Sequence, residues 1–178
     1  MNPEQTPADQ VPLEFLVVGN GASIATFEWE RLRPDIRVIL CNGAYEVIPV
    51  EPTYVVCSDE HWVTYLKEHC PHPFYTKSVW GDKHGVPSIP NSHKDSVTGP
   101  LAIQLAWCFS PQRIWVIGFD ILTHDSGDRY HNHPIKRRQI VNARRFQQQY
   151  NEQLRQCEFE ELQLLITPEQ WRKYLYTK

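Results

Sequence analysis

The stretch LEFLVVGNGAS, residues 13–23, decides the fold. Its apolar run, Leu13–Val18, is continuous and ends in the turn Gly19-Asn20-Gly21. A continuous apolar run bounded by glycines is typical of a strand that is buried on both faces of a parallel sheet. We therefore predict a buried strand here, followed by a helix over Ser23–Arg33 that Ser23 caps and Pro34 ends.

The same alternation continues along the chain. Further strands are expected at Arg37–Cys41, Tyr54–Cys57, Phe74–Thr76, Arg113–Gly118 and Leu162–Ile166. Helices are expected at Glu60–His69, at Thr98–Phe109 with Thr98 as its cap, and at Ile135–Gln156. Residues 80–96 are rich in glycine, proline and polar residues and are expected to form a long binding loop.

Strands that alternate with helices at this spacing predict βαβ units. We expect a single Rossmann-like, doubly wound α/β domain over residues 13–178, with a mostly parallel sheet and flanking helices. Residues 1–12 are expected to be a disordered lead-in.

Composition narrows the partners and the compartment. The net charge of −3 gives no electrostatic reason to expect duplex nucleic acid. No apolar run is long enough to cross a membrane, and the polar first ten residues are not expected to form a signal peptide. Cys41, Cys57 and Cys108 lie in apolar runs and are expected to be reduced core thiols, which indicates a cytoplasmic protein.

The strand ends carry the candidate binding residues. In a parallel sheet these ends meet at one edge, where the ligands of such folds bind. The residues concerned are Gly19, Asn20, Gly21, Ser23, Asn42, Ser58, Asp59 and Asp120. The first turn is Gly-x-Gly only, and no acidic residue follows the second strand, so a nicotinamide cofactor is disfavoured.

Histidine and aspartate gather after residue 120. His131 or His133 could act as a general base on a hydroxyl group. A divalent metal, Mg²⁺ or Mn²⁺, is a second interpretation, with Asp120, Asp125, Asp128, His131 and His133 as its candidate ligands. A solvated loop without chemistry is the third. In the 80–96 loop, Trp80 could stack on a base or a sugar.

Three stretches carry a family resemblance. FLVVGNGASI at 15–24, ERLRPDIRVILCNGAY at 30–45 and VTGPLAIQLAWCFSPQRIWVIGFD at 97–120 resemble motifs of Campylobacter-type bacterial sialyltransferases. The set also resembles pterin pyrophosphokinase-like proteins and phage glycosyltransferase-like proteins. The phage group shares a tryptophan after the third strand, here Trp62, and a Gly-Phe-Asp followed by His-x-His-Pro, here residues 118–120 and 131–134.

The resemblance implies a nucleotide site. It assigns Asn20, Gly21, Ser23, Asn42, Thr98, Gly99 and Asp120 to nucleotide binding, with Tyr130 as the candidate by position for the donor phosphate. The chain departs from the family at Ala22, where the family has proline. If the chain is phage-encoded, its compartment is the host cytoplasm.

The leading hypothesis is therefore a glycosyltransferase-like enzyme with a nucleotide-sugar donor, for which a CMP-sugar is the first candidate. One alternative is a pyrophosphokinase-like phosphotransferase that uses ATP and magnesium. The other is a catalytically silent phage accessory protein that binds a nucleotide or a partner. The sequence leaves open the acceptor, the donor sugar and whether the chain forms a homo-oligomer.

Overall fold

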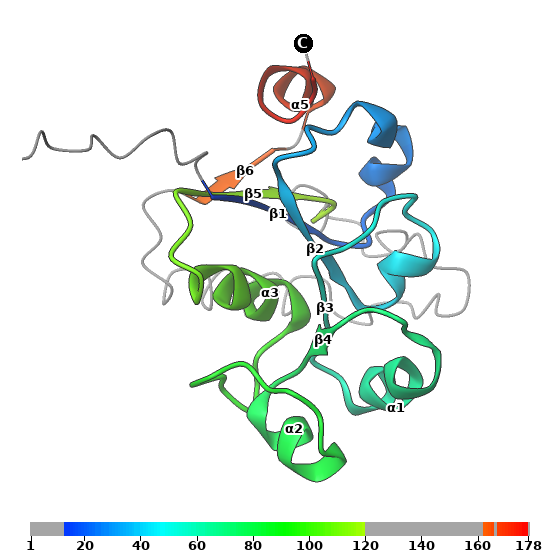
Figure 1. The fold of residues 1–178 in the computed structure, drawn as a ribbon, viewed down its shortest axis with the longest axis vertical. Helices are drawn as coiled ribbons and strands as arrows, with labels where there is room; N and C mark the ends of the chain where they lie inside the picture. The colour runs from blue at the N-terminus through cyan, green and yellow to red at the C-terminus, as the bar shows by residue number, and fades with distance from the viewer. Residues whose placement is uncertain (1–12, 120–161, 166, 178) are drawn as a thin grey trace, which may run out of the picture.

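The computed structural model describes residues 13–119, 162–165 and 167–177. Six strands of this part form one sheet in the order β4-β3-β2-β1-β5-β6, and every pairing is parallel (Figure 1). The strands are β1 Glu14–Val18, β2 Arg37–Cys41, β3 Tyr54–Val56, β4 Phe74–Tyr75, β5 Arg113–Ile117 and β6 Leu162–Leu164. The predicted Rossmann-like α/β fold is confirmed, with the predicted strands shortened by up to two residues at their ends.

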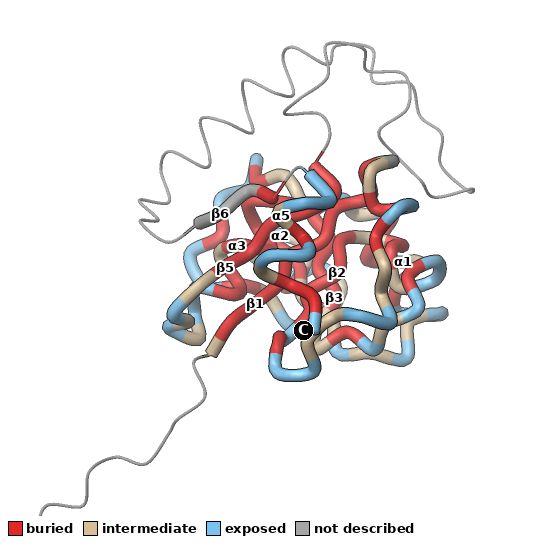
Figure 2. The backbone as a smooth tube through the Cα atoms, turned by 90° about the horizontal axis from the view of Figure 1, so that it is seen from above, coloured by how far each residue is buried: buried red, intermediate tan, exposed pale blue. Residues whose placement is uncertain are grey.

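β1 lies at the centre of the sheet and is buried on both sides. Phe15 and Val17 pack into the core beneath one face, whereas Leu16 and Val18 pack into the core beneath the other. All five residues of β1 are buried, and the strand is drawn red in Figure 2. This explains why the run is apolar without alternation.

Helices cover both faces of the sheet. The helices of the described residues are α1 Glu60–His69, α2 Ser78–His84, α3 Thr98–Trp107 and α5 Pro168–Tyr174, with 3-10 turns η1 Ala22–Thr26, η2 Trp29–Arg31 and η3 Asn42–Glu46. α3 packs on the face that carries Phe15 and Val17, and α5, η1 and η3 pack on the opposite face (Figure 1). No helix in the described ranges is long and apolar enough to cross a bilayer.

The expected helix over Ser23–Arg33 is wrong. The segment forms the two short turns η1 and η2, and Gly21 rather than Ser23 precedes the first of them. Phe27 lies between them and packs against the rings of Trp29, Trp171 and Tyr176. The aromatic contacts with the distant C-terminal segment, which no local pattern encodes, outweigh the weak helix propensity of this stretch.

The loop expected at residues 80–96 is partly wrong, because α2 extends to His84 and ends at Gly85, which has a φ of 63°. Thr98 is also not the cap of α3: Val97 holds that position, and the Thr98 hydroxyl bonds elsewhere.

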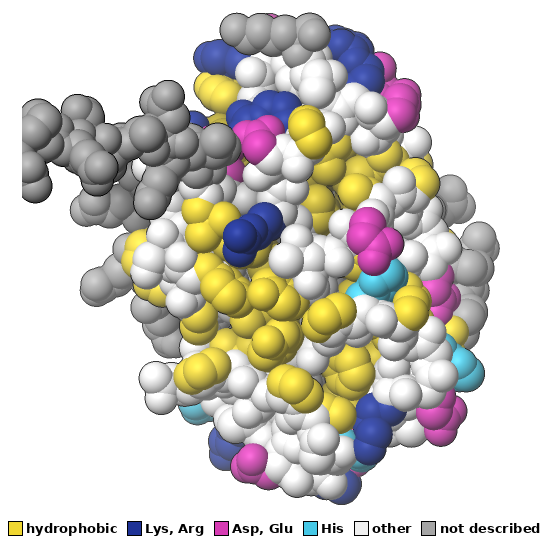
Figure 3. Space-filling view, in the orientation of Figure 1, with side chains coloured by type: hydrophobic (Ala, Val, Ile, Leu, Met, Phe, Trp, Pro, Cys, Tyr) yellow, Lys and Arg dark blue, Asp and Glu magenta, His cyan; other side chains and the backbone are white. Residues whose placement is uncertain are grey.

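The end of α3 is exposed, contrary to the core position expected of Cys108. Cys108 follows the last turn of α3 and is exposed. Trp107 is 48% exposed, and hydrophobic side chains gather on the surface over this helix (Figure 3). The helix is apolar on more sides than the sheet covers, so its last turn reaches solvent. Cys41 and Cys57 are buried free thiols, as predicted.

Candidate functional site

The strand order changes direction at β1. The chain adds β2, β3 and β4 on one side of β1, and then crosses through α3 to place β5 on the other side. In open α/β sheets the carboxyl edge beside such a switch point is where ligands bind. The turns that follow β1, β2, β3 and β5 therefore form the candidate site.

The turns after β1 and β5 are in close backbone contact. The Gly19 N–H donates to the Ile117 carbonyl at 2.9 Å, and the Gly21 N–H donates to the Gly118 carbonyl at 2.8 Å. A Cβ at Gly19 would overlap the Gly118 carbonyl oxygen, and Gly118 itself has a φ of 71°. These glycines thus bring the ends of β1 and β5 close to each other.

Asn20 ties the ends of β1 and β2 together. The residue is only 7% exposed, and its Nδ2 donates to the Cys41 carbonyl at 3.1 Å. Its Oδ1 is buried and has no hydrogen-bond partner in the described chain. Buried acceptors are nearly always paired, so this oxygen is a candidate acceptor for a ligand donor or a water molecule.

Asn42, Ser58 and Thr98 form one hydrogen-bonded cluster across the site. Thr98 Oγ1 lies 3.3 Å from Asn42 Oδ1, to which it donates, and 2.8 Å from Ser58 Oγ. It also accepts from the Ser58 backbone N–H at 3.2 Å. A threonine hydroxyl has one proton, so Ser58 Oγ must be the donor in their contact. The cluster joins the ends of β2 and β3 to the first turn of α3.

Asn42 is held in a backbone conformation that few residues adopt. Its φ is 53°, in the left-handed region where asparagine and glycine are favoured. Asn42 is the first residue of η3, which begins directly after β2. Because Oδ1 accepts from Thr98, the amide group is the part of this side chain left to donate to a ligand.

The remaining predicted residues of this edge have separate roles. Asp59 precedes α1, is exposed and makes no capping hydrogen bond, so its carboxylate can meet a hydroxyl or a cation. Gly99 is buried in the first turn of α3. The Ser23 carbonyl accepts from Thr26 within η1, beside the β1 turn.

The candidate catalytic and metal residues lie outside the described residues. They are Asp120, Asp125, Asp128, His131 and His133, and their assignments stay predictions. Tyr130, the candidate for binding the donor phosphate, also lies outside the described residues and stays a prediction. In the described ranges no group of three or more His, Cys, Asp or Glu side chains could hold a metal ion.

Burial suppresses the reactivity of the two thiols beneath the site. It raises the pKa of the Cys57 thiol to about 12, and it raises the pKa of Cys41 further. The thiolate is the nucleophilic form, so neither sulfur is a nucleophile at neutral pH.

Two residues near the site were missed or misread in the sequence. Lys77 follows β4 and is only 9% exposed, and the signal that could have found it is a basic residue directly after an expected strand. Trp80 lies on α2 rather than in a loop, and its Nε1 donates to the Ser58 carbonyl at 2.9 Å. This hydrogen bond holds the Trp80 ring against the end of β3.

Comparison with known proteins gives a distant structural likeness only. No family model and no curated protein matches the chain. A thiamin pyrophosphokinase from Geobacillus thermodenitrificans is similar in structure, with 13% sequence identity and a TM-score of 0.44. The match covers 86% of this chain, which spans only 59% of that protein's length, and a likeness this distant carries no argument about activity. The resemblance to sialyltransferases and phage glycosyltransferase-like proteins stays a prediction.

Proposed function

We propose that this chain binds a nucleotide at the carboxyl edge of its sheet and transfers a group from it. The observation that carries the proposal is the cluster of Asn42, Ser58 and Thr98, which joins two strand ends to the start of a helix. Its functional groups are neutral amide and hydroxyl groups, which suit the hydroxyls of a ribose and the edge of a base. The adjacent helix start favours the phosphate.

The transferred group is a sugar in the first form of this proposal. The donor is a nucleotide-sugar, with a CMP-sugar as the first to test, and His131 or His133 is the base that accepts the proton of the acceptor hydroxyl. Amide and hydroxyl side chains at the described edge support this form because they bind sugar and ribose hydroxyls without a metal.

The second form is a phosphotransferase that uses ATP and magnesium. The Asp59 carboxylate favours this form. It is exposed, follows Ser58 in sequence and makes no capping hydrogen bond, and carboxylates hold Mg²⁺ in phosphoryl-transfer sites. A thermal-shift panel of nucleotides and nucleotide-sugars, with and without Mg²⁺ or Mn²⁺, separates the two forms. A ligand that binds only the folded state raises the melting temperature.

Each outcome of the panel has a distinct meaning. Stabilisation by cytidine nucleotides without metal supports sugar transfer, whereas stabilisation by ATP only with magnesium supports the phosphotransferase. Stabilisation by a nucleotide with no turnover of any donor supports a silent binding protein. No shift at millimolar concentration of any nucleotide contradicts the proposed site.

Replacing Asn42 with glycine is expected to weaken binding of the best nucleotide of the panel about tenfold, which corresponds to about 1.4 kcal/mol. Glycine accepts the φ of 53° without strain, so the change removes the side-chain amide, including the acceptor of the Thr98 hydroxyl, without altering the backbone conformation. Calorimetric titration of the nucleotide into the full-length protein measures the effect.

The matched control is Asn91→Gly. Asn91 also has a positive φ, 56°, but it is exposed in the loop before α3. We expect this variant to bind nucleotide as the parent protein does. Equal affinities of the two variants would remove Asn42 from the site.

A further inference from the structure

Lys77 is a buried cation at the same edge as the proposed nucleotide site. It follows β4 by two residues and precedes the first turn of α2. It is 9% exposed, and no other lysine in the described ranges is buried. Lysine is almost never buried without a partner, so its surroundings need an explanation.

The Lys77 side chain lies beside the end of β3. Its Nζ is 5.6 Å from the centre of the Trp80 ring, and Trp80 Nε1 donates to the Ser58 carbonyl. The Thr76 hydroxyl, one residue earlier, donates to the Cys57 carbonyl at 2.9 Å. The charge of Lys77 also lowers the pKa of the Cys57 thiol, against the larger effect of burial. The ammonium group therefore lies close to the Cys57–Ser58 strand end.

This ammonium group has no anionic partner in the described part of the chain. No ion pair or hydrogen bond joins Nζ to another described residue, and the Trp80 ring is its only described contact of this kind. A ring face offsets part of the loss of hydration, but a buried charge is normally matched by an opposite charge. An anion supplied from outside the chain would meet this need.

The start of α3 presents a second group of donors to the same place. The backbone N–H groups of Thr98 and Gly99 have no acceptor in the described chain, because the first bond of the helix is Leu101 to Val97. The Thr98 side chain is bonded to Ser58. Ser58 therefore lies between two groups: Trp80, over whose ring Lys77 lies, bonds to its carbonyl, and Thr98, at the start of α3, bonds to its N–H and its hydroxyl. The start of a helix favours negative charge.

We propose that Lys77 and the start of α3 together bind the phosphoryl oxygens of the nucleotide. This assignment rests on the proposed function and gives it a direction: the phosphates lie toward β3 and β4. The base and ribose then lie toward Asn42 and Asn20, at the ends of β2 and β1. Asp59, which follows Ser58 directly in sequence, is exposed, so water screens its charge from this anion.

The test replaces Lys77 with methionine, which keeps the length and the packing of the side chain and removes its charge. Calorimetric titrations of the full-length protein use inorganic pyrophosphate, the best nucleotide of the panel and the nucleoside that matches it. We expect Lys77→Met to weaken pyrophosphate and nucleotide binding at least tenfold and to leave nucleoside binding unchanged. Lys77→Arg, which retains the charge, is expected to bind within a few-fold of the parent.

Lys83 provides a matched control. Its Nζ faces the same Trp80 ring at 5.5 Å, but its side chain is 57% exposed and forms an ion pair with Glu60 at 2.6 Å. Lys83→Met removes the charge of the other lysine that faces this ring. We expect the affinities for pyrophosphate, nucleotide and nucleoside all to stay unchanged. Melting curves of both variants exclude a loss of folding.

The outcomes separate this assignment from the proposed function. Nucleotide binding that is unchanged in Lys77→Met overturns the assignment and leaves the proposed function standing. Pyrophosphate binding that depends on Lys77, with no binding of any nucleotide, supports the assignment and contradicts the proposed function. Absence of both kinds of binding in the parent protein contradicts both.

Discussion

Replacing Gly19 with alanine is expected to lower the free energy of unfolding by about 3 kcal/mol, at the upper end of the usual cost of overpacking. The added Cβ would overlap the Gly118 carbonyl oxygen and lie 3.0 Å from its carbonyl carbon. Both atoms belong to the backbone, so no side chain can rotate away. The ends of β1 and β5 would have to separate, which strains the hydrogen bonds that Gly19 and Gly21 make there.

Thermal melting measures this effect. For a domain of this length, about 3 kcal/mol corresponds to a melting temperature lower by roughly 6–12 °C. Gly85→Ala is the control: this glycine has a φ of 63°, and a Cβ there would meet nothing within 4 Å. We expect it to cost only the strain of a positive φ, about 1 kcal/mol. Equal melting temperatures for the two variants would show that β1 and β5 do not approach so closely.

The sheet could be predicted because its signal is local. Each buried parallel strand needs a short apolar run, and the runs at Leu13–Val18, Arg37–Cys41 and Arg113–Gly118 are long enough to see. β4 has only two residues, so the sequence indicates its end only weakly, and the position of Lys77 just after that end is equally hard to predict. One signal was present and not used: Thr167-Pro168-Glu169-Gln170 is a capping box, and both of its hydrogen bonds form at the start of α5.

The contents of the site could be predicted better than its connections. The polar residues at strand ends are visible because parallel strands bring those ends to one edge. That Thr98 bonds to Ser58 and Asn42, rather than capping its own helix, depends on how α3 packs across β2 and β3. Those partners lie 40 and 56 residues away in sequence, so no local pattern contains them.

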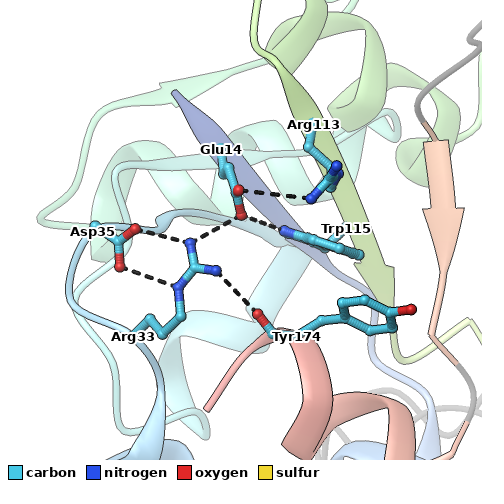
Figure 4. A network of polar contacts seen from close by, with 6 residues as sticks. All are labelled: Glu14, Arg33, Asp35, Arg113, Trp115 and Tyr174. Carbon is cyan, nitrogen blue, oxygen red and sulfur yellow. Dashed lines mark hydrogen bonds and ion pairs between the residues drawn. The ribbon is translucent and has the colours of Figure 1, made fainter. Parts of the chain in front are cut away.

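A buried ion-pair network at the other end of β1 gives the last prediction. Glu14 begins β1 with its side chain 8% exposed, and its Oε2 accepts from Trp115 Nε1 at 2.7 Å and from Arg33 Nη2 at 3.0 Å (Figure 4). Arg33 also donates to both carboxylate oxygens of Asp35 and to the Tyr174 carbonyl. This arginine therefore joins the start of β1 to the C-terminal helix.

Arg33→Met is expected to lower the free energy of unfolding by about 2–3 kcal/mol. Removing one partner of a buried ion pair costs about 3–5 kcal/mol, because it leaves a buried charge without its partner. We expect less here because the Arg33 side chain is 28% exposed and Arg113 stays 4.0 Å from Glu14. Chemical denaturation at neutral pH measures the change.

Arg31→Met is the matched control. Arg31 also forms an ion pair at 3.0 Å, with Glu28, but both side chains are at least 40% exposed. Exposed pairs contribute about 0–1 kcal/mol, and the contact of Arg31 with the Tyr176 ring adds little more. The comparison thus holds the pair distance constant and changes the burial of the carboxylate.

The difference between the parent protein and Arg33→Met is expected to narrow in acid. The hydrogen bond from Arg33 is the main reason why the pKa of Asp35 lies below its ordinary value of 3.8. A lowered carboxylate pKa stabilises the folded state above the unfolded pKa, and this contribution is lost as the pH falls through the folded pKa. Below about pH 4, the parent protein therefore loses the free energy of unfolding that the lowered Asp35 pKa contributes, whereas Arg33→Met lacks this contribution at every pH. Because Asp35 is exposed, solvent screening keeps this part small. If Arg33→Met and Arg31→Met destabilise the protein equally at neutral pH, then burial of Glu14 does not set the strength of this network.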